Sequence, residues 1–217
     1  MTQTPLVMLL TNQVAANFTS NCLLAVGARP AMVEEPCEAE ELAAAADALL
    51  VNLGTVTTHQ TEAMRLAAKT SSAHQVPWVL DPVGIPFLSF RRQLATDLLQ
   101  FNPSVIRGNR REIEEIRESA APGCVLLATG ETDQISTAGE TLEITGGTPL
   151  LQSVTATGCA QGAICAAFLG KGETPWEACT HASRLMKRAG ERAAAKAKAI
   201  GTFQIALLDA LWELSHD

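Results

Sequence analysis

A cysteine follows a short run of small, turn-forming residues in segment 154–163, which reads Val-Thr-Ala-Thr-Gly-Cys-Ala-Gln-Gly-Ala. An alanine-rich segment begins there, so the sequence predicts a helix with Cys159 in its first turn. The first turn of a helix has free backbone N–H groups and the positive end of the helix dipole, a combination that binds phosphate and lowers the pKa of a thiol. The segment therefore predicts an anion site beside an ionisable thiol, with a cysteine packed like an alanine as the alternative.

Four other groups of polar residues follow apolar, strand-like runs, at positions 52–55, 81–84, 107–109 and 129–130. The carboxyl ends of parallel strands lie at one edge of a sheet, and ligands bind outside that edge. One such group alone indicates little, because turns after strands are commonly rich in Gly, Asn and Asp. Four groups at one edge, together with the helix start, predict the rim of an active site.

Two carboxylates in these groups are candidate metal ligands. Glu112 lies three positions after Asn109, early in a predicted helix, so the two side chains share one helical face. A carboxylate at a helix start balances the helix dipole, and it also suits Mg²⁺, which prefers oxygen, keeps waters and takes few carboxylates. Asp81 is the second candidate, with a simple Asp-Pro turn as its alternative.

Strands and helices must alternate to bring these residues together. The predicted strands are 30–33, 48–53, 77–80, 104–106 and 125–129, with a hairpin at 133–137 and 141–145. The predicted helices are 38–47, 57–74, 88–100, 110–119, 158–169, 175–196 and 204–214. This order predicts an α/β fold with a mostly parallel central sheet and helices on both faces. We see no repeat and no long linker, so residues 1–217 are predicted to form a single domain.

The composition limits the partners. Hydrophobic residues make up 47% of the 217 residues and charged residues 18%, which is typical of a folded protein. The net charge of −7 argues against a nucleic-acid partner, so local donors must hold any anionic ligand. No apolar run is long enough to cross a bilayer, so we expect no membrane partner. The six cysteines form no CxxC pair and no basic leader opens the chain, which predicts reduced thiols and a cytoplasmic location.

One predicted helix has a row of basic residues that none of these motifs uses. Arg184, Lys187, Arg188 and Arg192 lie on the alanine-rich helix 175–196. We interpret them as a solvated face, with a subunit contact as the alternative.

Taken together, the motifs resemble those of the hydroxyethylthiazole kinase family, thiamine-salvage enzymes with a ribokinase-like fold. The resemblance spans nearly the whole chain and rests on Thr11-Asn12 with Asn17, segments 27–32, 52–55, 80–84, 106–109 with Glu112, 129–131, 146–147 and 157–159. It implies ATP-dependent phosphorylation of the primary alcohol of 4-methyl-5-(2-hydroxyethyl)thiazole. It also implies a homotrimer with sites between subunits.

The resemblance assigns a role to individual positions. The implied substrate-binding residues are Asn12, Met32, Gly54 and Ala156, and the implied ATP-binding residues are Arg107, Asn109, Thr129 and Gly158. Mg²⁺ would be organised by Glu112 and Asp81. Cys159 takes the position at which ribokinase relatives generally have an aspartate base, so we expect it to accept the alcohol proton as a catalytic residue. From this we predict that the variant Cys159→Asp keeps or raises activity.

The chain departs from the family pattern in three places. Ala156 stands where the family has glycine, the region between Glu112 and Thr129 is short, and the family has an additional N-terminal segment. The first change lies next to the expected phosphate and the second lies on the nucleotide side of the expected site. They leave open two alternatives to the thiazole kinase. One is a kinase-fold protein that binds the thiazole with weak or no ATP chemistry, and the other is a kinase of another small alcohol.

Overall fold

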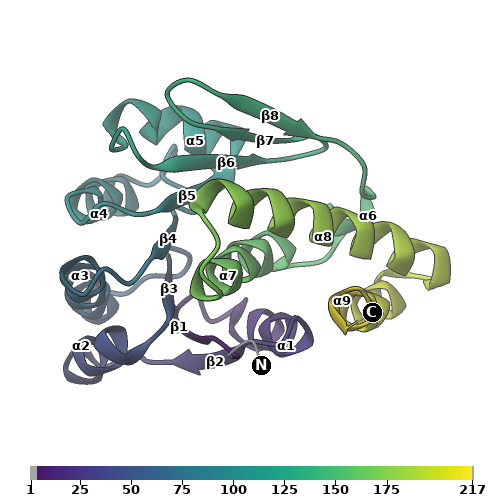
Figure 1. Ribbon diagram of the computed structural model, residues 1–217, viewed down its shortest axis with the longest axis horizontal. Helices are drawn as coiled ribbons and strands as arrows, with labels where there is room; N and C mark the ends of the chain where they lie inside the picture. The colour runs from purple at the N-terminus through teal and green to yellow at the C-terminus, as the bar shows by residue number, and fades with distance from the viewer. Residues whose placement is uncertain (1–3, 217) are drawn as a thin grey trace.

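The central sheet has eight strands in the order β2-β1-β3-β4-β5-β6-β7-β8 in the computed structural model, which describes residues 4–216 (Figure 1). The strands are β1 (Leu6–Leu10), β2 (Arg29–Met32), β3 (Ala48–Asn52), β4 (Trp78–Asp81), β5 (Val105–Asn109), β6 (Val125–Thr129), β7 (Asp133–Ser136) and β8 (Thr141–Ile144). Strands β1 to β6 pair in parallel, whereas β7 and β8 form an antiparallel extension. The predicted α/β class, mostly parallel sheet and hairpin are therefore confirmed.

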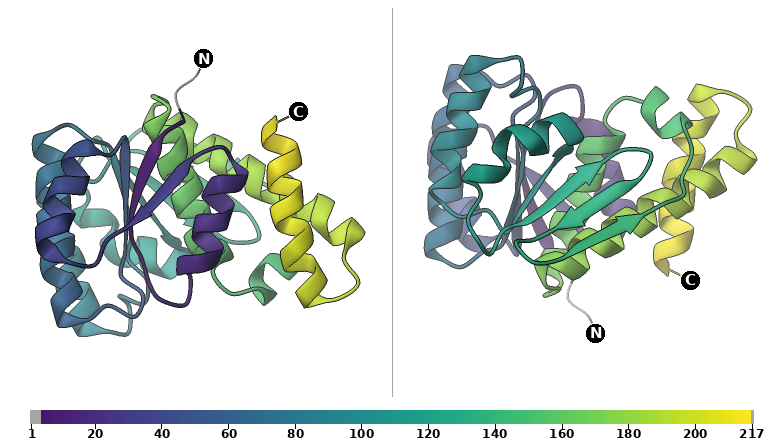
Figure 2. Two further views of the ribbon diagram at one scale, coloured as in Figure 1. Left: turned by 90° about the horizontal axis from the view of Figure 1, so that it is seen from below. Right: turned by 90° about the horizontal axis from the view of Figure 1, so that it is seen from above.

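Helices cover both faces of this sheet (Figure 2). One layer contains α2 (Pro36–Ala45), α3 (Thr58–Ala73), α4 (Ser89–Leu99) and α5 (Arg110–Ile116), which a short 3₁₀ turn, η1 (Arg117–Ser119), follows. The other layer contains α1 (Ala16–Ala25), α7 (Thr157–Gly170), α8 (Pro175–Lys196) and α9 (Ile200–His216), with α6 (Leu150–Ser153) just before α7. Within residues 4–216, no helix is both long and apolar enough to cross a membrane.

The sheet is buried on both sides, which the sequence of its strands explains. Every residue of β3 and β4 is buried, and both strands are almost continuously apolar, as expected for parallel strands between two helical layers. The polar exceptions are Asn52 and Asp81, the last residues of these two strands, and their Cα atoms are register partners. The strand pairing therefore places an amide and a carboxylate side by side at the carboxyl edge of the sheet.

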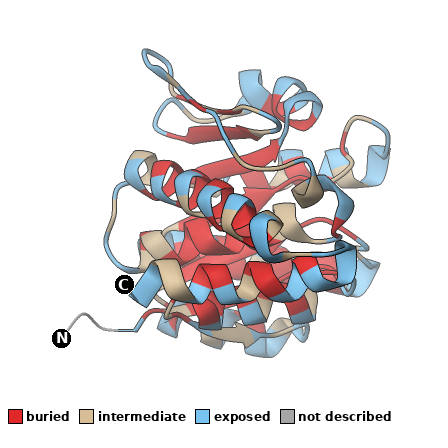
Figure 3. Cartoon of the chain, turned by 90° about the vertical axis from the view of Figure 1, so that its right-hand side faces the viewer, coloured by how far each residue is buried: buried red, intermediate tan, exposed pale blue. Residues whose placement is uncertain are grey.

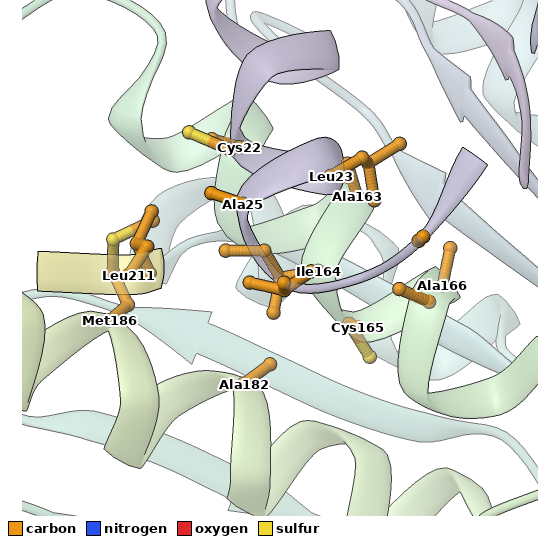
Figure 4. Close-up of a cluster of buried hydrophobic side chains, with 14 of the residues drawn as sticks. Cys22, Leu23, Ala25, Ala163, Ile164, Cys165, Ala166, Ala182, Met186 and Leu211 are labelled. Atoms are coloured by element: carbon orange, nitrogen blue, oxygen red, sulfur yellow. The ribbon is translucent and has the colours of Figure 1, made fainter. Parts of the chain in front are cut away.

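Helix α7 lies at the centre of one layer, against β1, β3 and β4 (Figure 1). Its sequence is apolar or small nearly all round, as expected for a helix enclosed on every side. Ala163, Ile164 and Cys165 of α7 pack among side chains of α1, α8 and α9 (Figure 4), and the burial pattern shows the same continuous core (Figure 3). This packing holds the first turn of α7 at the carboxyl ends of the strands.

The structure changes several predicted boundaries. Strand β1 and helix α1, which the pattern analysis did not predict, come first in the described chain. Strand β5 continues through Arg107 to Asn109, so Arg107 lies within a strand and not in the turn after it. Helix α9 begins at Ile200 and not near residue 204. The first two differences affect the site, because Asn12 comes shortly after β1 and because a side chain on a strand is held more firmly than one in a turn.

Candidate active site

Helix α7 begins after an unusual residue. Ala156 is the N-cap, with φ 72° and ψ 0°, which is the left-handed conformation that glycine adopts freely and alanine resists. The Thr157 hydroxyl donates to the Leu151 carbonyl oxygen at 2.7 Å and lies 3.2 Å from that of Val154, which fixes the turn. Cys159 is in the first turn, as predicted. The departure from glycine at position 156 therefore falls where the backbone favours glycine.

We predict that Ala156→Gly stabilises the fold by about 0.5–1 kcal/mol, because glycine removes the left-handed strain at a small entropic cost in the unfolded chain. Urea unfolding with two-state fitting measures this difference. Ala160→Gly is the matched control, since Ala160 lies inside the same helix and glycine there costs about 1 kcal/mol or more. An Ala156→Gly variant no more stable than the wild type would contradict the strain argument.

The Cys159 sulfur lies among amide groups from two strand ends. Asn52 Nδ2 donates to Sγ at 3.3 Å, and Asn12 Nδ2 donates to it at 3.5 Å. Asn52 Nδ2 also donates to Asp81 Oδ2 at 2.7 Å, and Asn12 Nδ2 also donates to Asn52 Oδ1 at 2.9 Å. Each amide nitrogen therefore uses both of its N–H groups. Gly54 N donates to Asn52 Oδ1 at 2.9 Å. The structure thus joins the predicted residues Asn12, Gly54, Asp81 and Cys159 through Asn52.

The pKa of the Cys159 thiol is raised, which is opposite to the predicted direction. Burial is the largest cause, and the neighbouring Asp81 carboxylate adds to it, while Arg107 and the two asparagine amides act in the opposite direction. The prediction from the helix start was wrong because desolvation of the thiolate and a nearby negative charge outweigh the favourable groups. Cys159 therefore holds its proton more firmly than an ordinary cysteine.

Asp81 is fully buried, and burial raises its pKa to about 6 against the opposing effect of Arg107. Arg107 Nη1 lies 3.4 Å from Asp81 Oδ2, and Arg107 Nη2 donates to Thr129 Oγ1 at 2.8 Å. A Cβ atom on Gly158 would lie 2.5 Å from Nη2, so the guanidinium packs directly on the first turn of α7. Two buried polar atoms here, Asp81 Oδ1 and Arg107 Nε, have no hydrogen-bond partner within the described chain.

A cavity of about 300 Å³ opens beside this guanidinium. Its lining includes Arg107, Asn109, Thr129, Gly158, Asp133, Gln161 and Lys187. The four predicted ATP-binding positions thus line one cavity. A second cavity of about 590 Å³ is walled by the loop 145–149. It shares four lining residues with the first: Gly130, Leu151, Gln152 and Lys187.

Glu112 has a structural role that its sequence position did not reveal. Its Oε2 accepts from Asn109 N at 2.8 Å, and Asn109 Oδ1 accepts from Glu112 N at 3.0 Å, which is a reciprocal capping box at the start of α5. Its Oε1 accepts from Gly84 N at 2.8 Å, which ties the turn after β4 to α5. Within residues 4–216, no cluster of three or more His, Cys, Asp or Glu residues is arranged to bind a metal.

Met32 ends the edge strand β2, where it is the register partner of Leu9 in β1, and it is 43% exposed. The sequence analysis included Asn52 in the predicted rim segment 52–55 but gave it no role, and it did not select Asp133, Gln161 or Lys187 as site residues. Asn52 had a signal, because it is a polar residue at the end of a fully buried strand. The interpretation of Lys187 as part of a solvated face was wrong, because it is only 6% exposed and lies one helical turn from Ser183, which is fully buried.

Comparisons with known proteins agree with one another. The model of the hydroxyethylthiazole kinase family matches residues 1–123 and 116–217. Hydroxyethylthiazole kinase from Shigella sonnei is 39% identical over 237 aligned positions, covering 98% of this chain and 90% of the relative. The enzyme from Leptospira interrogans is also 39% identical, over 239 positions, covering 99% and 90%. Both alignments are longer than the 217 residues of this chain, so the relatives have residues that it lacks.

Solved structures show the same relationship. The hydroxyethylthiazole kinase protein of Pyrococcus horikoshii superposes with a TM-score of 0.90 at 33% identity, covering 96% of this chain and 88% of that one. A pyridoxal kinase from Staphylococcus aureus in complex with ADP has a TM-score of 0.67 at 14% identity, covering 88% and 89%, which is a likeness of fold alone. The two family matches overlap at residues 116–123, inside the segment that the sequence analysis found short.

Proposed function

The chain belongs to the hydroxyethylthiazole kinase family, and from this we propose that it transfers the γ-phosphate of ATP to the primary hydroxyl of 4-methyl-5-(2-hydroxyethyl)thiazole in thiamine salvage. The first turn of α7 supports this most directly. It has the Arg107 guanidinium packed against Gly158 and, one residue later, the Cys159 thiol bonded by Asn12 and Asn52. A cation suited to phosphate and a thiol whose thiolate form can accept a proton thus lie at one helix start.

In the proposed reaction, the alcohol oxygen attacks the γ-phosphorus while the bond from that phosphorus to the ADP oxygen breaks. The alcohol proton passes to the Cys159 thiolate, giving the thiol, a phosphate ester and ADP. The amides of Asn12 and Asn52 donate to the sulfur and stabilise its negative charge. Arg107 stabilises the charge on the phosphoryl group in transfer.

We propose that Asp81 and Glu112 would hold Mg²⁺. Asp81 Oδ1 is buried without a hydrogen-bond partner in the described chain, and each Glu112 oxygen accepts a backbone N–H and retains lone pairs. Both carboxylates therefore have acceptor capacity left for metal-bound water, which Mg²⁺ keeps readily. When bound, Mg²⁺ neutralises charge on the ATP phosphates.

The two substrates occupy opposite sides of the first turn of α7 in this proposal. The thiazole lies on the β1–β3 side, against Asn12, Gly54 and Ala156. The nucleotide lies in the cavity on the β5–β6 side, where Arg107 and Thr129 hold phosphates and Asn109 and Gly158 complete the wall. The strand order separates the two sides, because β4 lies between β3 and β5.

We further propose a homotrimer with each site completed by a neighbouring subunit. The exposure of Met32 at the edge strand supports this, since a thiazole-binding side chain needs a cover that residues 4–216 of one subunit do not provide. Light scattering after size-exclusion chromatography measures the mass of the assembly. Because ATP is the phosphate donor, we place the reaction in the cytoplasm.

The test of the function is steady-state phosphorylation of the thiazole alcohol with Mg-ATP, accompanied by thermal shifts with each ligand alone. We expect turnover and separate stabilisation by the thiazole and by ATP. Stabilisation by the thiazole without any response to ATP would favour the binding protein, and turnover of other small alcohols alone would favour a different kinase. Two observations favour the binding protein as the second candidate. The N-cap at Ala156 is strained, and this chain lacks residues that its relatives have.

A further inference from the structure

Lys187 is a buried cation in the middle of α8, away from the Cys159 cluster. Only 6% of it is exposed, and it lines both cavities described above. A buried lysine is costly unless its charge and its three N–H donors are matched. The groups that bind the Lys187 ammonium therefore indicate what this buried lysine does.

The Lys187 ammonium joins α8 to two loops. Its Nζ donates to the carbonyl oxygens of Glu131 at 2.8 Å, Gly130 at 3.3 Å and Gly146 at 3.4 Å. Asp133 Oδ1 lies 3.4 Å from the same nitrogen. Three carbonyl dipoles and one carboxylate thus surround the ammonium. They come from the turn between β6 and β7, from the first residue of β7 and from the loop after β8.

The loop after β8 is held by α8 at both polar atoms of a single peptide unit. Lys187 binds the carbonyl of Gly146, and Glu191 Oε1 accepts from the N–H of Gly147 at 2.7 Å. Both glycines have positive φ, 100° and 87°, and a Cβ on Gly147 would lie 3.3 Å from Lys187 Cγ. The backbone therefore rests directly on α8, between two side chains that are one helical turn apart.

Asp133 extends this network towards α7. Its Oδ1 accepts from Gly130 N at 3.0 Å, and its Oδ2 accepts from Gln161 Nε2 at 2.8 Å. Gln161 Nε2 also donates to Ser183 Oγ at 3.1 Å. Gln161 lies in the same helix as Gly158 and Cys159, so the network connects the loops around both cavities to the helix that begins at the reacting groups.

We infer that Lys187 is a positioning residue for the nucleotide: it fixes the 130–132 turn and the 145–148 loop on α8, and these two segments shape the cavities into which ATP extends beyond Arg107. This inference rests on the proposed function, and it concerns only the nucleotide side of the site. The sheet order places Lys187 and its loops at the β6–β8 end, whereas Asn12 and Gly54 lie at the β1–β3 end. Its loss therefore affects ATP and leaves the thiazole unaffected.

The test compares Lys187→Met, which keeps the length of the stem and removes the ammonium, with the wild-type chain. We expect the Kd and KM for Mg-ATP to rise about tenfold and the KM for the thiazole alcohol to stay within about twofold. In the protein without ligands, we expect hydrogen exchange at the amides of Gly130 and Gly147 to become about tenfold faster. Parallel increases in both KM values, or unchanged exchange at these amides, would overturn the inference.

Two further variants separate positioning from general stability. Lys171→Met is the control, because Lys171 also donates to a backbone carbonyl, that of Val26, at 3.1 Å. Lys171 caps the C-terminal end of α7, whereas Cys159 is at the other end, so we expect neither KM to change. Glu191→Ala releases the other side of the Gly146–Gly147 peptide, so it should weaken ATP binding in the same direction. It also tests the inference if Lys187→Met does not fold, and an unchanged Kd for Mg-ATP in Glu191→Ala would then contradict it.

The outcomes for the function and for the inference are distinguishable. A wild-type chain without thiazole phosphorylation would contradict the proposed function. The exchange rates and the Kd for Mg-ATP would still decide the role of Lys187. A working kinase whose Lys187→Met variant binds Mg-ATP normally would keep the function and overturn the inference.

Discussion

Gly158→Ala is expected to lower kcat/KM for ATP by about 100-fold, the loss typical of removing one preorganised charge-stabilising donor. The added Cβ would lie 2.5 Å from Arg107 Nη2 and 2.9 Å from Nη1, distances at which the guanidinium must move. Arg107 is 8% exposed and bonds Thr129 and Asp81, so it cannot move without breaking these contacts. The variant therefore displaces Arg107, the cation that we propose binds phosphate, without deleting it.

The fold should tolerate this substitution, because Gly158 is a helical residue without positive φ and alanine favours helices. Gly162→Ala is the matched control, one turn further along α7. Its Cβ would lie 3.5 Å from Leu50 and 3.8 Å from Arg107, which are ordinary contacts, so we expect nearly wild-type kinetics. Equal losses in both variants would show that alanine in α7 is harmful for reasons other than Arg107.

Replacing Cys159 is the second change with a large expected effect. Cys159→Ala should lower kcat about 100-fold, because it removes the proposed acceptor of the alcohol proton. Cys159→Asp should keep or raise activity, since a carboxylate is ionised at neutral pH far more fully than a thiol. Steady-state rates with saturating Mg-ATP measure both effects. Cys165→Ala, a buried cysteine two turns along the same helix, controls for loss of a packed sulfur.

The pH dependence gives a sharper test of the same role. Burial and Asp81 raise the pKa of the Cys159 thiol, so the thiolate fraction and the rate should rise with pH through the neutral and mildly alkaline range. In Cys159→Asp, the base should already be ionised there, so the rise should disappear. A folded, inactive Cys159→Asp protein, or the same alkaline rise in both proteins, would exclude Cys159 as the base.

The fold was predictable because its strongest signals are local. Strands β3 and β4 are continuous apolar runs, and their polar end residues, Asn52 and Asp81, mark the carboxyl edge of the sheet. The hairpin of β7 and β8 and the start of α7 also have turn residues at the expected places. Strand β1 was missed, although all but one of its residues are buried and its last four form part of the apolar core.

The sequence by itself determined the types of group at the site and their order along the chain: a thiol at a helix start, an arginine after one strand, a carboxylate after the preceding strand and a second carboxylate in the helix that follows the arginine. Only the tertiary structure decided their ionisation and partners. Burial beside Asp81 reversed the predicted shift of the Cys159 pKa, and the capping box gave Glu112 backbone partners. Lys187 changed from a solvated residue to a buried link between loops. The physical reason is that desolvation and charge coupling depend on distances between segments far apart in the chain, which no local pattern records.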